Sequence, residues 1–379
     1  MEYTEQKLVP SIPKIDISDI HVGLVEHGVV LPYAKDSIGN TNGLGGVLHA
    51  NYEYETKSGL SENGYLKYGG KYDFDISDIE DDQEDAIWFG LFKKHWGHFI
   101  IELVCRLWYV IENYKGQKIV YISEDGELMD GNFLEFLNYL NIPNSNIKRV
   151  TRPTRFNTIT IPDYCATERF YSDYYIQIFN TVINNSKYWK LDHPAEKYVY
   201  FTRRNFFYSK FKDFGEKRVE DIFNQNNFKS IAPEKLSLRE QILVWNESKE
   251  IVSVNGSIPL NIVFSTKKPS VIVLNKTRRL HGNLVNISKI LDYPITYVDA
   301  YYPKYDKLIK NMGSGPFIIY LSPYLRNFLK DNKFVFEYTI YDKFIKLRAM
   351  FYVAKFFFYE GCRIILKKVK LRSIIKKIK

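Results

Sequence analysis

The sequence predicts an α/β protein with two doubly wound domains that face each other and a basic, amphipathic helical tail. Three observations lead to this fold class. The chain of 379 residues is longer than a single hydrophobic core usually becomes. Short apolar runs alternate with segments of helical period, which is typical of strands followed by covering helices. The third observation is a concentration of positive charge in the last part of the chain.

We expect four segments along the chain. They are an N-terminal domain (1–190), a C-terminal domain (191–310), a return segment that packs between the domains (311–342) and the tail (343–379). In the N-terminal domain, the pattern predicts strands at 86–90 and 118–123, and helices after Gly97, at 132–140 and at 168–185. Both domains are therefore expected to be Rossmann-like.

The C-terminal domain has the more regular alternation. The predicted strands are 197–202, 228–232, 251–254 and 271–275, and the predicted helices are 216–226, 237–246 and a short one at 257–264. Strands separated by helices in this way form a parallel sheet. In such sheets ligands bind beyond the carboxyl ends of the strands, so the residues that follow each strand are candidates for a binding site.

An imidazole and a carboxylate lie one helical turn apart in the segment HWGHFIIE, which begins at His95. Gly97 allows a sharp turn into the helix, and His98, Glu102 and Arg106 follow at intervals of four along one helix face. The positive end of the helix dipole disfavours imidazolium, which leaves His98 able to accept a proton. We expect Glu102 to orient the ring, Arg106 to keep Glu102 ionised and His95 to support the site. The alternative is a buried histidine satisfied by its own helix.

Basic and small polar residues follow the strands of the C-terminal domain. Arg203 follows the first strand, and Arg218 opens the next helix. Guanidinium groups at such points suit a diphosphate, to which they donate paired hydrogen bonds. The strand that ends at Val254 is followed by NGSIPLN, in which glycine permits close backbone approach and the following helix offers amides to an anion. The diphosphate-binding candidates here are Asn255, Gly256, Ser257 and Asn261.

The excess of basic over acidic residues is confined to the tail. Residues 343–379 contain twelve Lys or Arg and one acid, whereas the rest of the chain has 41 basic and 43 acidic residues. This distribution argues against nucleic acid as a partner and favours a helix that lies on an anionic membrane surface. The alternative is a helix packed on the protein with its lysines in water. The predicted membrane-binding cations are Lys367, Lys368, Lys370, Arg372, Lys376 and Lys377.

Cysteine usage and hydropathy bear on the compartment. Cys105, Cys165 and Cys362 are far apart and show no paired spacing, as in proteins of the cytosol. The first residues carry no apolar run fit for a signal peptide, and no segment has the length needed to cross a bilayer. We therefore expect a cytoplasmic protein, peripheral on the inner face of the cell membrane. The sequence leaves open whether it forms a homo-oligomer.

Five blocks follow one another along the chain. They are HWGHFIIELVCRLW (95–108), YFTR (200–203), Arg218, LSLREQI (236–242) and SVNGSIPLNIVF (253–264). In this order they resemble glycosyltransferase family 61. The regions YVD (297–299) and GSGPF (313–317) are similar to a bacterial branch associated with capsular and other surface polysaccharides.

The resemblance implies a GT-B fold and an inverting transfer from a nucleotide-activated sugar with no obligatory metal. It implies that the second domain binds the donor and the first the acceptor, and it places Arg203, Arg218, Gly256 and Asn261 on family positions. This chain departs from the family at Asn255, where members commonly have histidine, and at 258–260, where they have a Gly-Leu-Thr-like run. Donor identity is therefore not inherited.

These residues give a mechanistic hypothesis. His98 is the base that deprotonates the acceptor hydroxyl, oriented by Glu102. Arg203, Arg218 and the amides near Gly256 stabilise the departing diphosphate. Glu102 itself, or an acid between 73 and 85, is an alternative base. His95, His98 and Glu102 could ligate a metal, but no further ligand stands at diagnostic spacing, so we predict neither a metal nor a cofactor.

The predicted reaction is transfer of a sugar from a nucleotide-diphosphate donor, with a UDP-sugar expected. The acceptor would be a growing surface or capsular polysaccharide or a glycolipid at the membrane. Two alternative functions would also account for some of these sequence features. A polysaccharide pyruvyltransferase or other group transferase on a GT-B-like fold would need the same basic clamp, and a non-catalytic membrane scaffold would need only the tail.

Overall fold

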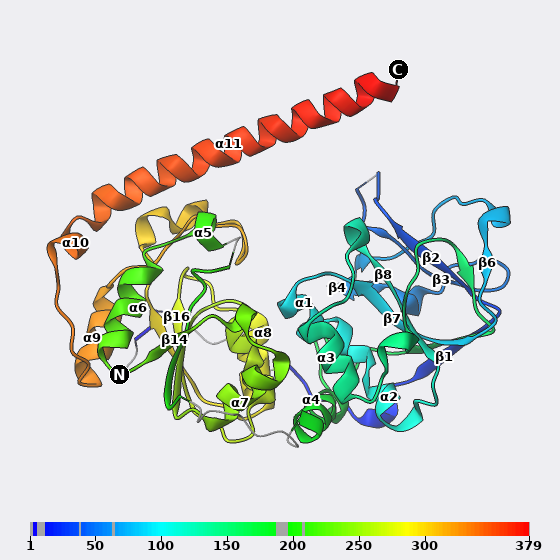
Figure 1. The fold of residues 1–379 in the computed structure, drawn as a ribbon, viewed down its shortest axis with the longest axis horizontal. Helices are drawn as coiled ribbons and strands as arrows, with labels where there is room; N and C mark the ends of the chain where they lie inside the picture. The colour runs from blue at the N-terminus through cyan, green and yellow to red at the C-terminus, as the bar shows by residue number, and fades with distance from the viewer. Residues whose placement is uncertain are drawn as a thin grey trace. The chain divides into compact units, whose positions relative to one another are not determined.

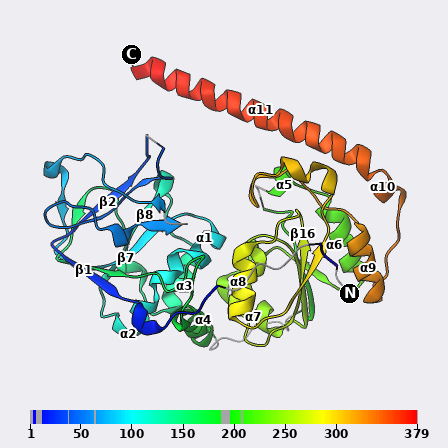
Figure 2. The same cartoon turned by 180° about the vertical axis from the view of Figure 1, so that it is seen from behind.

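The computed structural model describes residues 3–5, 12–37, 39–62, 65–186, 196–206 and 209–378. The chain forms two compact units, drawn from opposite sides in Figures 1 and 2. The N-terminal unit consists of Pro10–His193 and Ser237–Leu243, and the C-terminal unit of Met1–Val9, Pro194–Leu236 and Val244–Lys379. Each unit is assembled from separate stretches of chain, whereas we expected contiguous domains.

The N-terminal unit contains a five-stranded sheet of order β1-β11-β7-β8-β9, a four-stranded sheet of order β3-β2-β10-β6 and the hairpin β4-β5. In the five-stranded sheet β11, β7, β8 and β9 are parallel, and β1 is antiparallel to β11. The strands are β1 (Val22–Glu26), β2 (Val29–Ala34), β3 (Leu44–Leu48), β4 (Leu60–Glu62), β5 (Tyr65–Tyr68), β6 (Glu80–Asp81), β7 (Asp85–Phe92), β8 (Lys118–Ser123), β9 (Ile147–Arg149), β10 (Thr154–Arg155) and β11 (Thr158–Pro162). The α-helices are α1 (Trp96–Ile101), α2 (Trp108–Asn113), α3 (Asn132–Tyr139) and α4 (Asp173–Ser186).

The two faces of the five-stranded sheet are covered differently. On one face, Phe99 of α1 makes edge contacts with Phe89 of β7 and with Phe136 of α3. On the other, Trp88 shares a buried cluster with Val30 and Val47 of the second sheet. The Rossmann-like expectation is correct for the first face and wrong for the second. The described chain before α1 forms strands and short 3₁₀ turns, so it supplies no α-helix for that face.

The C-terminal unit is built on a five-stranded parallel sheet of order β14-β12-β15-β16-β17. Neighbouring residues of β12 face opposite layers, because Tyr200 packs on Phe223 of α6 and Phe201 stacks on Trp245 of α7. Figure 1 shows the strands between α6 and α9 on one side and α7 and α8 on the other. This unit is therefore doubly wound, as predicted, and its inner strands β12, β15 and β16 are mostly apolar because both faces are buried.

The strands and helices predicted for this unit are present, with ends that differ by at most one residue. Its strands are β12 (Tyr198–Phe201), β13 (Asp213–Phe214), β14 (Lys229–Ile231), β15 (Glu250–Val254), β16 (Ser270–Asn275), β17 (Ile295–Asp299) and β18 (Phe317–Ile318). Its helices are α5 (Ser209–Lys212), α6 (Glu216–Gln225), α7 (Leu238–Glu247), a 3₁₀ helix (Ile258–Phe264), α8 (Gly282–Ile290), α9 (Pro323–Asp331), α10 (Ile340–Lys343) and α11 (Ile345–Ile378). The first turns of α7 belong to the N-terminal unit by their contacts.

The segment expected to pack between the domains lies in the C-terminal unit. Leu325, Phe328 and Leu329 of α9 enter the same buried cluster as Val252 and Ile272 of the sheet. These contacts cover one face of the sheet, so α9 completes the doubly wound layer on the side of α6.

The tail is helical, as predicted, and α11 is drawn in orange to red in Figures 1 and 2. Ala349 and Val353 in its first turns are buried in a cluster with Ile318. None of the described helices combines the length and apolar composition needed to span a bilayer. The side chains of residues 365–379 lie outside the described part of the structure. That range includes all six predicted membrane-binding cations, Lys367, Lys368, Lys370, Arg372, Lys376 and Lys377.

Candidate functional site

The segment His95 to Glu102 lies at the carboxyl end of β7, in the parallel part of its sheet. The chain leaves β7 after Phe92 and enters α1 at Trp96. His95 is the N-cap, and its Nδ1 accepts a hydrogen bond from the backbone N–H of His98 at 3.4 Å. His95 therefore helps to order the first turn, in which His98 lies.

His98 and Glu102 form a hydrogen-bonded pair. The Nδ1 of His98 lies 2.9 Å from Oε1 of Glu102, and Nζ of Lys67 lies 3.2 Å from the same oxygen. The histidine side chain is 34% exposed and the glutamate 13%. Burial raises the pKa of Glu102, but the contacts with His98 and Lys67 outweigh burial and hold the pKa below its ordinary value. An ionised Glu102 accepts Nδ1–H, which leaves Nε2 of His98 with a lone pair.

Arg106 does not support Glu102, contrary to our expectation. Its buried guanidinium donates hydrogen bonds to the carbonyls of Pro162 and Lys57 and stacks 4.0 Å from the ring centroid of Tyr164. The reason is that α1 ends at Ile101 and Leu103–Arg106 is a 3₁₀ helix. Four residues advance about 40° around an α-helix but about 120° around a 3₁₀ helix, so Arg106 leaves the face of Glu102. Lys67, which the sequence did not single out, takes the expected place.

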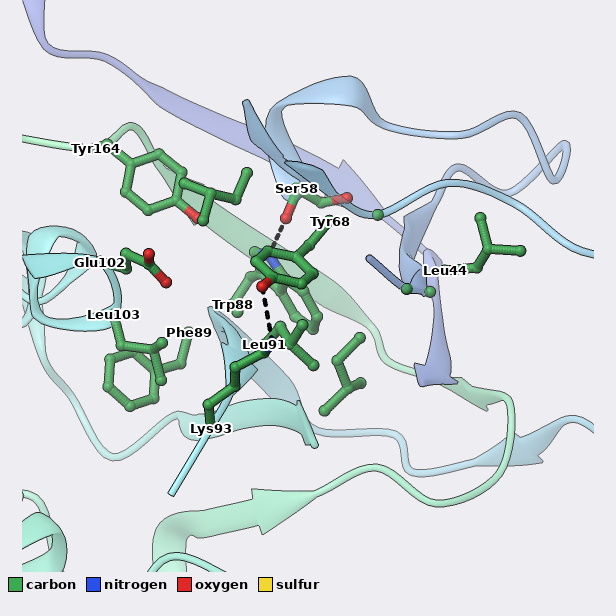
Figure 3. Close-up of a pocket in the computed structure, with 16 residues that line it drawn as sticks. Leu44, Ser58, Tyr68, Trp88, Phe89, Leu91, Lys93, Glu102, Leu103 and Tyr164 are labelled. Atoms are coloured by element: carbon green, nitrogen blue, oxygen red, sulfur yellow. Dashed lines mark hydrogen bonds between the residues drawn. The ribbon is translucent and has the colours of Figure 1, made fainter. Parts of the chain in front are cut away.

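A pocket in the N-terminal unit opens beside Glu102 (Figure 3). Its walls include Tyr68, Trp88, Lys93 and Tyr164, and it holds about 20 Å³ of water-accessible space, enough for one water molecule. Nζ of Lys93 donates to the Tyr68 hydroxyl at 2.7 Å. The pocket therefore places a carboxylate, a phenol and an ammonium group around a space of the size of a hydroxyl group.

Glycines shape the wall of this pocket. Gly69 has a φ of +118°, and a Cβ added there would lie 2.2 Å from the Tyr54 hydroxyl oxygen. Gly90 has a φ of +119°, and the register of β7 on β8 shifts between Trp88 and Gly90. A bulge of this kind redirects side chains next to functional sites.

Four of the acids between 73 and 85, which were alternative bases, are held by contacts of their own. Glu80 pairs with Arg152, Asp81 with Arg155 and Asp82 with Lys148. Asp75 accepts a hydrogen bond from the backbone of Ser77 and caps a 3₁₀ turn. These contacts are typical of a surface segment in which acids stabilise the local structure. They do not suggest that these four acids act as bases.

The second group of candidates gathers at one point of the C-terminal sheet. The strand order reverses between β12 and β15, and ligands of open α/β sheets bind at such switch points. Arg203 follows β12, and Asn255 and Gly256 follow β15. Nη1 of Arg203 donates to the Asn255 carbonyl at 3.4 Å, and a Cβ on Gly256 would lie 2.5 Å from that Nη1. A side chain at position 256 would therefore displace the guanidinium from this place.

Buried polar atoms without hydrogen-bond partners lie near this point. Among the described residues, they include Oδ1 of Asn255, Oγ of Ser253, Oγ1 of Thr277 and both carboxylate oxygens of Asp213, which lies 3.4 Å from Nε of Arg203 without a hydrogen bond. Leaving such groups unpaired costs free energy, so several together indicate a place where a polar ligand completes the hydrogen bonding. The amide of Asn255 is oriented by Asn275, to which it donates at 3.0 Å.

Lys276 is a candidate that the sequence analysis missed. It follows β16 directly and is 1% exposed, with Nζ 3.9 Å from the ring centroid of Phe317. Burial, followed by the charge of Arg203, lowers the pKa of Lys276 to about 7. The rule that pointed to Arg203 also applies here, because Lys276 stands just beyond the predicted strand 271–275.

Glu216 lies on the other side of Arg203. One carboxylate oxygen accepts a hydrogen bond from the backbone N–H of Arg203 at 2.8 Å, and burial raises the pKa of Glu216 to about 7. A buried acid and a buried lysine that titrate near neutrality in one cluster are typical of a functional site.

Arg218 lies away from this cluster. Its Nη2 donates to Asp342 of α10 at 2.9 Å and to the carbonyl of Glu337, so it joins α6 to the segment before the tail. Ser257 is the N-cap of the 3₁₀ helix Ile258–Phe264, and Asn261 is buried within that helix. The structure thus brings together Arg203, Asn255, Gly256 and Lys276.

Comparison with known proteins gives one family. Residues 96–273 match the family described as Glycosyltransferase 61. No curated protein matches the chain. The matched stretch runs from the first residue of α1 into β16, so it contains both the His98–Glu102 pair and the switch point of the C-terminal sheet. Residues 96–273 therefore carry a glycosyltransferase family 61 domain, and the protein is a glycosyltransferase.

Proposed function

We propose that the protein transfers a sugar, with inversion, from a nucleotide-diphosphate donor to a saccharide or lipid-linked acceptor of a bacterial surface polysaccharide. A UDP-sugar is the expected donor. In the GT-B arrangement that the family resemblance implies, the C-terminal unit holds the donor and the N-terminal unit the acceptor. The observation that carries the proposal is the His98–Glu102 pair, held at 2.9 Å within the stretch that matches the family.

On the acceptor side, His98 acts as the general base. Glu102 fixes the ring with Nδ1–H toward the carboxylate, so that Nε2 removes the proton from the acceptor hydroxyl. The acceptor oxygen forms a bond to the anomeric carbon while the bond from that carbon to the donor phosphate breaks. Lys67 keeps Glu102 ionised, which stabilises the imidazolium as it forms.

On the donor side, the leaving group is a nucleoside diphosphate that carries away the electron pair. Arg203 and Lys276 supply positive charge where the departing oxygen gains negative charge, and this interaction grows in the transition state. Asn255 offers an amide in place of the histidine common in the family. It can hydrogen-bond a phosphate or ribose but cannot donate a titrating proton. With these cations in place, the proposal requires neither a metal nor a cofactor.

The family match favours this function over the two rivals. It supports sugar transfer rather than pyruvyl transfer, and catalysis rather than a purely scaffolding role. Incubation of membrane extract with labelled nucleotide sugars, compared with labelled phosphoenolpyruvate, tests the first distinction. Incorporation from phosphoenolpyruvate alone would contradict the proposal.

The base is tested by His98→Ala. We expect kcat to fall by roughly 10² to 10⁴-fold with little change in the donor KM, because the proton transfer is lost while the donor site is untouched. Glu102→Gln is expected to lower kcat less. His21→Ala, at an exposed position of the same unit, is the matched control and should be neutral. Near-normal turnover by His98→Ala would refute His98 as the base.

A further inference from the structure

The first turns of α11 are apolar on two opposite faces. Ala349, Val353 and Phe356 are buried on the inner face, and Tyr352 stacks on Phe214 of β13 at 4.9 Å. These contacts fix the rotation of the helix on the C-terminal unit, so the residues on its other face point away from that unit.

The outer face carries a stripe of exposed apolar side chains. Leu347, Phe351, Ala354 and Phe358 follow at intervals of four, three and four, which places them along one line of a helix. Leu347 is 46% exposed, Phe351 64% and Phe358 70%. Single exposed apolar residues are ordinary, but a line of large ones on a helix whose opposite face is already packed indicates a contact surface.

The charge of the sequence beyond this stripe indicates which kind of partner the stripe binds. In the sequence, Phe358 is followed by a strongly basic segment that includes Lys367, Lys368 and Lys370. Residues 343–379 contain twelve cations and one acid, and that acid, Glu360, pairs with Arg363 at 3.1 Å. An apolar stripe flanked by cations matches the interface of an anionic bilayer, where side chains enter the acyl boundary and cations meet headgroups.

A second copy of the chain is the other conceivable occupant, because the spacing of the stripe also fits a coiled coil. The flanking positions argue against it. Lys346 and Lys355 stand beside the stripe, so two apposed helices would bring like charges together without acids to pair them.

We propose that the outer face of α11, formed by Leu347, Phe351, Ala354 and Phe358, binds the surface of an anionic lipid bilayer. The apolar stripe enters the interfacial layer, and the cations that follow it hold the protein on negative headgroups. This assigns the contact to the first half of the helix as well as to its basic end. The proposal rests on the surface of α11 and not on the sugar-transfer reaction.

The test is flotation of the full chain with vesicles. We expect binding to phosphatidylcholine vesicles that contain about 30% phosphatidylglycerol and much weaker binding to pure phosphatidylcholine. Phe351→Glu with Phe358→Glu should weaken binding roughly 100-fold, since each buried phenylalanine contributes about one factor of ten or more. The charge-neutral pair Phe351→Ser with Phe358→Ser should also weaken it. Ile76→Glu with Leu128→Glu, equally exposed positions in the N-terminal unit, is the matched control and should bind like the wild type.

Two results would overturn the proposal. One is unchanged flotation of both phenylalanine pairs. The other is a lipid-free wild-type dimer that either pair converts to a monomer, which would show that a second copy covers the stripe. Donor binding, measured by thermal shift with UDP, should be the same in all variants and reports that they are folded. Flotation does not depend on catalysis, so this test can succeed or fail independently of the proposed sugar transfer.

Discussion

The chemistry expected of His98 depends on two residues that touch Glu102. The imidazole ring of His98 hydrogen-bonds to Glu102, and Lys67 of β5 in the same unit places a positive charge beside the same carboxylate. The helical spacing predicted the first contact, because residues four apart on a helix are neighbours. It predicted the wrong cation, since Arg106 turns away where α1 changes to a 3₁₀ helix. Whether the helix continues for one more turn depends on packing, which spacing does not report.

Lys276 provides a prediction at the same scale. Replacement by Met should raise the donor KM by roughly 10 to 100-fold, since an ion-paired hydrogen bond to phosphate is lost. Donor binding to the wild type should take up a proton above pH 7, because a bound diphosphate favours the ammonium form of a lysine whose pKa is about 7. Calorimetry of UDP binding in two buffers of different ionisation enthalpy measures this uptake. Lys267→Met, at an exposed lysine, is the control.

The free protein should show the matching stability effect. The folded-state pKa of Lys276 is about 7, below its ordinary value of 10.5, so from pH 7 to 10.5 the unfolded chain binds a proton that the folded chain does not. Stability from this group therefore rises with pH over that window. Lys276→Met should be more stable than the wild type near pH 7, with a gap that closes toward pH 10. Denaturant unfolding of both proteins at several pH values measures the difference in their free energies of unfolding. A difference that stays constant with pH would contradict a lowered pKa of Lys276.

At the scale of elements, α6 joins the donor cluster to the tail. Glu216 at its first turn contacts Arg203, while Arg218, two residues later, pairs with Asp342 of α10. Burial raises the pKa of Asp342, but the hydrogen bonds from Arg218 and Thr339 outweigh it and hold the pKa below its ordinary value. Helix α6 thus contacts the donor cluster through Glu216 and the segment before the tail through Arg218.

Arg218→Ala should destabilise the protein without weakening donor binding. The expected cost is about 3 kcal/mol, because Asp342 would be left buried without its partner. The donor KM should stay within about twofold of the wild type. Lys217→Ala, at the exposed neighbour that pairs with Asp221 of the same helix, should change neither quantity. A large rise in KM with unchanged unfolding free energy would instead support the sequence-based prediction that Arg218 binds the diphosphate.

At the scale of the whole molecule, the two units differ in how regular their sheets are. The C-terminal unit is a parallel, doubly wound sheet, and the N-terminal unit combines a mixed sheet with a second β-sheet. The switch point lies in the regular unit, which agrees with donor binding there.

Hydrogen exchange with and without UDP tests this division. We expect protection at the residues that follow β12, β15 and β16, because the nucleotide would close hydrogen bonds around Arg203, Asn255 and Lys276. The segment 93–106 should exchange at an unchanged rate. UMP, which lacks the second phosphate, should bind more weakly and protect these residues less. Protection confined to 93–106 would reverse the assignment of donor and acceptor units.

The sequence by itself determined the regular parts of this protein. Apolar runs placed β12, β15 and β16, and helical period placed α6, α7 and α11, because these patterns record which faces are buried. The rule of strand ends then led to Arg203 and Gly256. The pairing of His98 with Glu102 also followed from local spacing, since His98 lies in α1 and Glu102 is the C-cap of that helix four residues later.

Only the tertiary structure decided the rest. The order of strands, and hence the switch point, depends on pairings between residues far apart in the chain. Lys67 meets Glu102, and Arg218 meets Asp342, through such long-range contacts. Lys276 acquires its low pKa from burial, which no local pattern specifies. Periodicity reports which side of an element is covered, whereas partners and dielectric surroundings depend on what covers it.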